Sequence, residues 1–239
     1  MAHRLAWLPK PGHDDAMRRF LYLSPYFPPQ TRVGALRPLK FARHLPDHGW
    51  APLVLADLWQ ESQLDADLVD AIPETTMVVR DWSGRAAKAW RGFERAPVRP
   101  VSDAARVRDV ADDPPRRRLR DRLRLPRWLD NPELIPLGEH GPRIPHALAA
   151  ARKLLQQTPC EAIVVNADPF AACLVGTALK RETGLPLIID LRDPWALCEL
   201  RRPLRPALVA VLIARLERDV MRVADRVLLN TETTLRDYR

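Results

Sequence analysis

Glycine, cysteine, lysine and aromatic residues are all scarce in this chain of 239 residues. Its nine glycines form no G-x-G-x-x-G pattern, so the usual dinucleotide-binding fingerprint is missing. The three cysteines, Cys160, Cys173 and Cys198, form no C-x-x-C pair and have no histidine at ligand spacing, which predicts reduced thiols in a cytosolic protein. The longest apolar run, residues 207–214, is far shorter than the roughly eighteen residues of a membrane-spanning helix.

Metal ligands are also few. His44 and His48 stand four apart, a spacing that suits a metal on a helix, but Pro46 lies between them and Gly49 follows. This pattern favours a helix end with two exposed imidazoles. We therefore expect no metal site.

The net charge of +8 and the isoelectric point near 10.0 would suit nucleic acid, phosphorylated substrates or an acidic membrane. Only five lysines contribute to this charge, and the excess of arginine accompanies 24 prolines and abundant alanine, as GC-rich coding sequences produce. A solvated arginine-rich surface is favoured over a specific anion site. With 46% hydrophobic residues, the chain has enough apolar surface for a packed globular fold.

Residues 1–19 read as a poorly ordered N-terminal extension, without periodicity. Lys10, Asp14 and Asp15 break its weak apolar character, so it is not a signal peptide. We expect Met17 to be the natural start, which the intact mass of the native protein would test.

Short apolar runs then alternate with helical patterns over residues 20–239, which predicts an α/β fold with a Rossmann-like parallel sheet and helices on both faces. The predicted strands are 20–24, 52–56, 76–80, 162–166, 187–190 and 226–230. One predicted helix begins at Gly34, and the other main helices span 62–70, 143–157, 169–183 and 203–223.

Residues 81–140 interrupt this alternation with an irregular stretch rich in arginine and proline. The composition favours a solvent-exposed, partly disordered insertion. The alternative is an amphipathic basic surface for anionic lipid headgroups or a lipid-linked acceptor, since seven arginines between Arg116 and Arg127 are interleaved with leucines.

Ligands of open parallel sheets bind at the carboxyl ends of the strands. The first such loop leads to Gly34, whose missing side chain lets backbone N–H groups approach an anion at a helix N-terminus, with Arg37 one turn further on. The second holds Asp168 before Pro169, a pattern that capping of a helix explains well.

The third strand-end loop is the most distinctive, because Asp190, Arg192, Asp193 and Trp195 crowd the end of an apolar strand. Capping could explain Asp193, since Pro194 follows it. Burying Asp190 or Arg192 costs free energy unless each is paired or exposed in a cleft, so this loop is the strongest local indication of a site. A fourth loop at Asn230, with cap residues opening the last helix, is ambiguous.

The order of these motifs resembles the N-terminal, acceptor-side domain of family-4 glycosyltransferases. The resemblance rests on Ser-Pro-Tyr-Phe-Pro-Pro from Ser24, Gly-Ala-Leu-Arg from Gly34, Asn-Ala-Asp-Pro from Asn166, Asp-Leu-Arg-Asp-Pro-Trp from Asp190, and the stretch from Ala224 to Glu232. It runs from about Phe20 to the end, except for the insertion.

The resemblance implies one domain of a two-domain, B-type (GT-B) glycosyltransferase that retains anomeric configuration, needs no metal or cofactor, and uses a nucleotide-sugar as co-substrate. It places Gly34 at the donor diphosphate, and Arg37, Asp168, Arg192 and Asp193 on the side of a glycan or lipid-linked acceptor. Catalytic residues are not assigned. The donor-binding domain, with its basic residue and paired glutamates, is not in this sequence, and Cys173 replaces a histidine common in similar proteins.

We therefore expect a glycosyltransferase-like domain that is incomplete for catalysis alone and needs a donor-binding domain or subunit. It would be cytoplasmic or peripheral at the inner membrane. The alternative is a non-catalytic remnant or adaptor with a basic membrane- or partner-binding surface. A nucleic-acid binder ranks last, because the arginine cluster lacks interleaved stacking aromatics in an RNA-binding pattern.

Overall fold

The computed structural model describes residues 17–31, 33–57, 65, 67–84, 136–199 and 201–239. These residues form one six-stranded sheet with the strand order β3-β2-β1-β4-β5-β6, in which every pairing is parallel. This is the Rossmann order, with the direction of winding reversed between β1 and β4. The strands are β1 (Arg18–Leu23), β2 (Trp50–Ala56), β3 (Met77–Arg80), β4 (Ala162–Asn166), β5 (Leu187–Leu191) and β6 (Arg226–Leu229).

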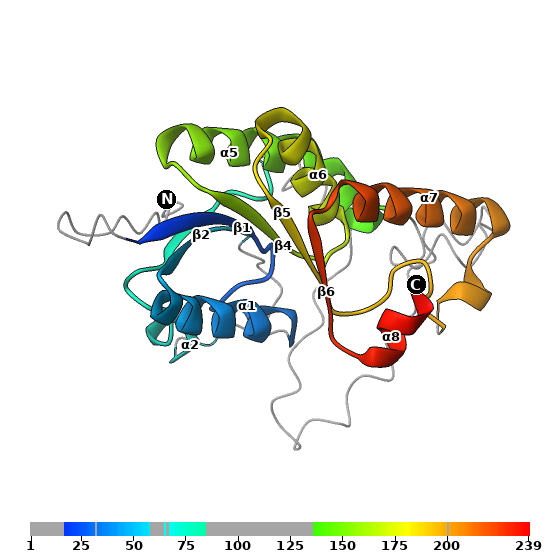
Figure 1. Cartoon of the computed structure of the whole chain (residues 1–239), viewed down its shortest axis with the longest axis horizontal. Helices are drawn as coiled ribbons and strands as arrows, with labels where there is room; N and C mark the ends of the chain where they lie inside the picture. Colours follow the sequence, from blue (N-terminus) through cyan, green and yellow to red (C-terminus); the bar gives the residue numbers. More distant parts are fainter. Residues whose placement is uncertain (1–16, 32, 58–64, 66, 85–135, 200) are drawn as a thin grey trace, which may run out of the picture.

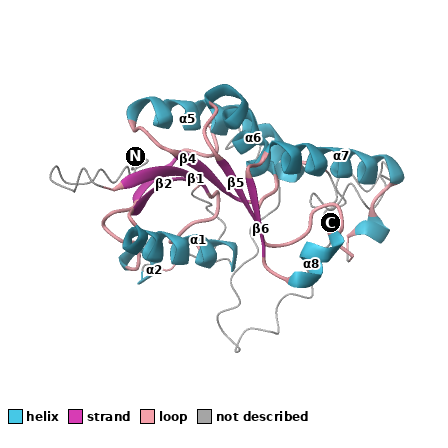
Figure 2. Ribbon diagram, in the orientation of Figure 1, coloured by secondary structure: helices cyan, strands magenta, loops and turns pink. Residues whose placement is uncertain are grey.

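Helices cover both faces of the sheet, as Figures 1 and 2 show. α1 and α2 lie on one face, and α5, α6 and α7 on the other. The helices are α1 (Val33–His44), α2 (Asp67–Asp70), α5 (Ile144–Gln157), α6 (Ala171–Thr183), α7 (Ala207–Val223) and α8 (Glu232–Asp237), with short 3-10 segments η1 (Leu45–His48), η5 (Gly138–Arg143) and η6 (Arg202–Leu204).

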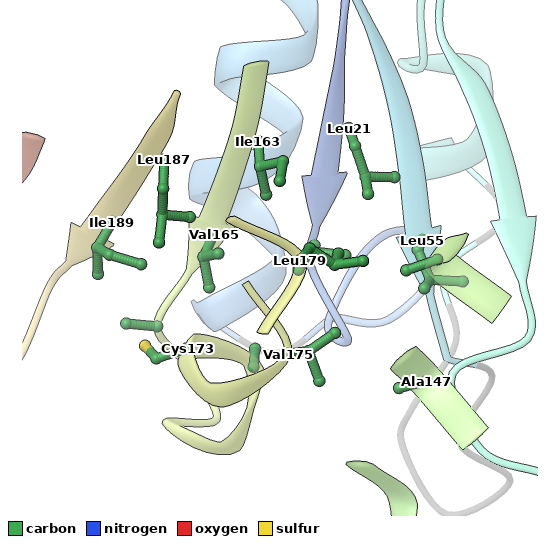
Figure 3. Close-up of a cluster of buried hydrophobic side chains, with 14 of the residues drawn as sticks. Leu21, Leu55, Ala147, Ile163, Val165, Cys173, Val175, Leu179, Leu187 and Ile189 are labelled. Carbon is green, nitrogen blue, oxygen red and sulfur yellow. The ribbon is translucent and has the colours of Figure 1, made fainter. Parts of the chain in front are cut away.

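The main core lies between the sheet and the α5–α6 layer. Side chains of a strand alternate between the two faces. Leu21 of β1 lies in this core with Val175 and Leu179 of α6 (Figure 3), and Leu23 belongs to the same cluster. Phe20 and Tyr22 belong to a second cluster on the α1 face. The near-continuous apolar runs of the strands are thus explained by burial on both sides.

The α1 face is covered less completely. An apolar groove of about 280 Å³ opens beside α1 and runs across the strands toward the β6 edge. Its lining includes Tyr22 from β1, Val164 from β4, Ile188 from β5 and Leu228 from β6, which is 40% exposed.

The predicted fold class is confirmed, and all six predicted strands are present. The predicted helix end near His48 is also confirmed, because α1 passes into η1 and Gly49 ends it in the left-handed region at φ 78°. The predicted helix over 62–70 is described only from Asp67 on, and most of the extension and of the insertion, with its cluster between Arg116 and Arg127, lies outside the described residues.

The two ends of the predicted insertion are part of the fold. Trp82 is fully buried in the main core with Ala147 and Ala151 of α5. His140 and Arg143 are also buried, and the His140 ring lies 3.2 Å from the Tyr26 hydroxyl and 3.1 Å from the Arg143 guanidinium. The expectation of a solvent-exposed segment is therefore wrong at Trp82 and His140, because their burial depends on packing against distant elements.

Candidate functional site

The loop after β1 is held rigidly at the carboxyl edge of the sheet. Ser24 is buried and its hydroxyl donates to the Tyr26 carbonyl at 2.7 Å. Gln30 is also buried, and its amide donates to the Asp57 carbonyl at 2.7 Å. The prolines of this loop keep its backbone out of the sheet, and these two side chains supply hydrogen-bond donors to backbone carbonyl groups there. The start of α1 is thereby fixed next to the ends of β1 and β2.

Gly34 allows α1 to approach the loop after β4. A methyl group at this position would lie 2.6 Å from Asp168 Oδ2 and 3.3 Å from the Tyr26 ring. The Gly34 carbonyl accepts a hydrogen bond of 3.1 Å from Asn166 Nδ2, which also donates to Ser24 Oγ at 3.3 Å. The buried Asn166 side chain therefore links the loops after β1 and β4, a positioning role that sequence reasoning missed although a polar residue ending an apolar strand could have indicated it.

Arg37 reaches across to β5 and pairs with Asp190. Its Nε and Nη2 donate to the two carboxylate oxygens at 2.7 and 2.8 Å, a bidentate geometry. The Asp190 side chain is fully buried, whereas that of Arg37 is 36% exposed. The hydrogen bond to Asp190 raises the pKa of Arg37. Asp190 thus has the partner that its burial requires, and the pair engages the Arg37 guanidinium that the resemblance places on the acceptor side.

Tyr22 lies beneath this pair. Its hydroxyl is buried and has no hydrogen-bond partner among the described residues. Burial and then the negative charge of Asp190 raise its pKa well above the usual range, while Arg37 opposes the shift. The phenol is therefore neutral at physiological pH.

Arg192, in the loop after β5, lies between the carboxylates of Asp168 and Asp193 at the carboxyl edge of the sheet. Its Nε and Nη2 donate to Asp193 Oδ2 at 3.0 and 2.8 Å, and Nη2 lies 3.9 Å from Asp168 Oδ2. The Nη1 atom of Arg192 is buried and has no acceptor within the described part of the chain. A buried donor without an acceptor calls for an explanation, such as a bound oxygen ligand or water.

The loop after β5 is anchored from behind by α7. Glu217 is buried, and its Oε1 accepts from the backbone N–H groups of Trp195 and Ala196 at 3.0 Å each and from the Tyr238 hydroxyl. The Trp195 ring stacks on Phe170, with 5.0 Å between the centroids and 7° between the planes. The loops after β4 and β5 are thereby joined. Sequence reasoning missed Glu217, although a single acid in the apolar inner stripe of α7 was a usable signal.

Two capping interpretations need correction. α6 begins at Ala171 and its N-cap is Phe170, which makes no side-chain cap, so Asp168 does not cap this helix and Pro169 is not its first residue. Asp193 opens no helix and pairs with Arg192 instead. The cap predicted at the last helix is confirmed, because the Thr231 side chain accepts from the Thr234 N–H.

The predicted site residues are thus brought to one edge of the sheet. Gly34, Asp168, Arg192 and Asp193 form a chain of contacts across the loops after β1, β4 and β5. Arg37 joins them through Asp190, whose strand neighbour is Asn166. Their role in substrate binding stays a prediction.

Replacing Gly34 by alanine should destabilise the protein by roughly 1 kcal/mol, because the overpacking cost of 1–3 kcal/mol exceeds the gain in helix propensity. In an Asp168→Ala background the cost should disappear, since the carboxylate oxygen at 2.6 Å is gone. Urea unfolding of the two single variants and the double variant measures this coupling. Additive effects would contradict the predicted close contact.

Other ligand chemistry is not in evidence within the described residues. They contain no group of three or more histidine, cysteine or acidic side chains placed to hold a metal ion. Cys160, Cys173 and Cys198 are free, and burial raises the pKa of the Cys173 thiol to about 12. Cys173 packs in the core (Figure 3). No described helix is long and apolar enough to cross a membrane.

The chain matches no protein-family model and no curated protein. It is similar to two solved structures of UGT2 from Phytolacca americana, one apo and one complexed with UDP-2fluoro-glucose and pterostilbene. Both are 15% identical with a TM-score of 0.47, over 91% and 93% of this chain and 47% and 49% of theirs.

A third similar structure is a complex between a UDP-glucosyltransferase from Polygonum tinctorium, capable of glucosylating indoxyl, and 3,4-dichloroaniline. It is 13% identical with a TM-score of 0.35, over 74% of this chain and 30% of that one. The chain spans about half the length of the first two proteins. At this identity and overlap, the likeness does not assign the chain to a family.

Proposed function

We propose that this chain is the acceptor-side domain of a two-domain glycosyltransferase that transfers a sugar from a nucleotide-sugar to a glycan or lipid-linked acceptor. The proposal joins the family-4 resemblance of the sequence motifs to the position of those motifs in the fold. A donor-binding domain or subunit completes the enzyme, and this chain alone does not transfer sugar.

One observation carries the proposal. The motifs that resemble the family contribute Gly34, Asp168, Arg192 and Asp193 from three separate loops, and these residues meet at the carboxyl edge of the sheet. This edge lies where the strand order reverses between β1 and β4, the place where open α/β sheets bind ligands. Helix caps also lie at this edge, but Asp168 does not cap α6, and Asp193 pairs with Arg192. Capping therefore does not explain these contacts.

The chemistry of this edge suits a sugar and a departing diphosphate. The carboxylates of Asp168 and Asp193 can accept hydrogen bonds from sugar hydroxyls. Arg192 supplies a positive charge, and its Nη1 is a donor without an acceptor among the described residues. The N-terminal end of α1 directs its partial positive charge toward the same edge. Arg192 and the N-terminal end of α1 would stabilise negative charge as it develops on the leaving diphosphate, and the two carboxylates would serve the sugar hydroxyls.

A transfer assay tests the proposal. The chain is mixed with a candidate donor-binding domain, a labelled nucleotide-sugar and an acceptor extract, and Arg192→Ala is compared with the parent. We expect kcat/KM to fall about tenfold or more, because a hydrogen bond to a charged group contributes roughly 1.5–3 kcal/mol.

Arg181→Ala is the matched control, because Arg181 is an exposed arginine that pairs with Asp219 on the outer helices. Its kcat/KM should stay within about twofold of the parent, since an exposed ion pair contributes little. Equal activity of Arg192→Ala and parent would refute the assigned role of this edge. Failure of every donor-binding partner to give transfer with the folded chain would refute the transferase proposal.

The alternative function, a non-catalytic adaptor with a basic membrane- or partner-binding surface, is tested separately. Its basic surface was predicted in residues 81–140, most of which lie outside the described residues. Location at the inner membrane likewise stays a proposal. An adaptor would retain a partner or membrane interaction while no donor-binding domain restored sugar transfer.

A further inference from the structure

We infer that the outer face of α7 is a docking surface for an anionic lipid membrane. α7 lies beside α6 in the helical layer and is the last helix of that layer toward the β6 edge (Figure 1). Its inner stripe, Val209, Ile213, Glu217 and Val220, is buried. The opposite, outer face of α7 is therefore the face exposed to solvent.

The first half of this outer face is apolar. Leu208 is 71% exposed, Val211 50% and Leu212 41%. These positions recur at helical spacing, so they share one face. Leu204, in the preceding η6, is 61% exposed. Isolated exposed leucines are ordinary, but Leu208, Val211 and Leu212 share one helix face and form an apolar patch on it.

The second half of the same face is basic. Arg215, Arg218 and Arg222 continue the spacing and are exposed. None of the three forms an ion pair with a carboxylate in the part of the chain that the structure describes. The one acid beside them, Asp219, is already paired with Arg181 at 2.8 Å. The helix thus presents leucine and valine followed by uncompensated positive charge.

This combination fits a lipid surface better than a second copy of the chain. Two copies joined through this face would place arginines against arginines or against leucines, and the face offers no free carboxylate to compensate them. An anionic membrane satisfies both halves, since apolar side chains enter the headgroup boundary while arginines meet phosphates. α7 does not span the bilayer; it would lie in the plane of the membrane surface.

The docking face is connected to the candidate site through the helix. Trp195, in the loop after β5, packs against Val209 and Ile213 on the inner side of α7. Membrane contact on one side of α7 would therefore hold the strand-end edge close to the lipid headgroups. The inference stands apart from the proposed function, because membrane binding can be measured without sugar transfer.

Vesicle co-sedimentation of the full chain tests the inference. We expect binding to phosphatidylcholine vesicles that contain phosphatidylglycerol, and weak binding to phosphatidylcholine alone. The variant Leu208→Gln/Val211→Gln/Leu212→Gln should bind at least about tenfold more weakly, because buried apolar surface drives insertion. The variant Arg215→Gln/Arg218→Gln/Arg222→Gln should lose about fivefold per arginine at low salt, and less at high salt.

The matched controls change exposed residues on other elements. Val69→Gln/Leu235→Gln alters apolar residues of α2 and α8, and Lys40→Gln/Arg43→Gln/Lys153→Gln removes three basic charges from α1 and α5. Both should bind like the parent, and circular dichroism should show every variant folded. Three results would overturn the inference: no binding of the parent to anionic vesicles, unchanged binding of folded α7 variants, or a parent dimer that the α7 substitutions dissociate.

Discussion

Replacing Asp190 by alanine is expected to destabilise the protein by about 3 kcal/mol, as measured by urea unfolding followed through tryptophan fluorescence. The carboxylate is fully buried and accepts both hydrogen bonds of Arg37 at 2.7 and 2.8 Å. Removing it leaves a guanidinium without its partner above the buried Tyr22 hydroxyl. The value lies at the low end for a broken buried pair, because Arg37 is 36% exposed and can turn toward water.

Two control variants distinguish the loss of the buried Arg37–Asp190 pair from the loss of an exposed carboxylate. Asp219→Ala removes the acid of the exposed pair with Arg181 and should cost under about 1 kcal/mol. The double variant Arg37→Met/Asp190→Leu should recover most of the lost stability, because an apolar pair of similar volume needs no compensation. If Asp190→Ala costs no more than Asp219→Ala, the pair does not contribute to the fold as its geometry indicates.

The sheet was predictable because its signal is local. Each strand is short and mostly apolar. Burial on both faces imposes that pattern on the central strands, whereas β6 at the sheet edge keeps alternate residues exposed. Boundaries were less accurate. The helix predicted over 203–223 begins at Ala207, since Pro206 is its N-cap and a separate 3-10 turn precedes it.

Trp82 shows what local composition could not give. It stands just after the strand at 76–80 and opens a stretch rich in arginine, and nothing in that stretch indicates a core residue. Its burial arises from Ala147 and Ala151, more than sixty residues away, whose small side chains leave room for the indole. Such a contact is a property of the packed helix and is invisible to periodicity.

The sequence likewise predicted some features of the candidate site and not others. Crowded charges after β5 indicated correctly that Asp190 needs a partner, but its partner is Arg37, which sequence analysis had assigned to a ligand. Asp168 was explained by capping, yet it lies against Gly34, far away in sequence. The topology of a parallel sheet indicates which residues gather at its carboxyl edge. The pairs among them depend on side-chain contacts between distant segments, which no local pattern encodes.

Replacing Glu217 by alanine is expected to cost about 3 kcal/mol in the same unfolding measurement. The change leaves the buried N–H of Trp195 and the partly buried N–H of Ala196 without their acceptor, and an unsatisfied buried donor costs roughly 1–3 kcal/mol. Trp195 N–H keeps only a 3.3 Å contact with the Tyr238 hydroxyl, so part of the loss is offset. The cavity left by the side chain adds to it.

A second readout distinguishes this network from general loss of stability. Burial and then the hydrogen bond to Glu217 hold the pKa of Tyr238 above its usual range, so Glu217→Ala should lower that pKa in an ultraviolet titration. Glu217→Gln retains an oxygen acceptor and should cost only about 1 kcal/mol. Glu232→Ala, an exposed acid on α8, should change neither quantity measurably. An unchanged Tyr238 pKa in folded Glu217→Ala would show that α7 does not anchor the loop after β5 through this carboxylate. The Trp195–Phe170 stack would then need another support.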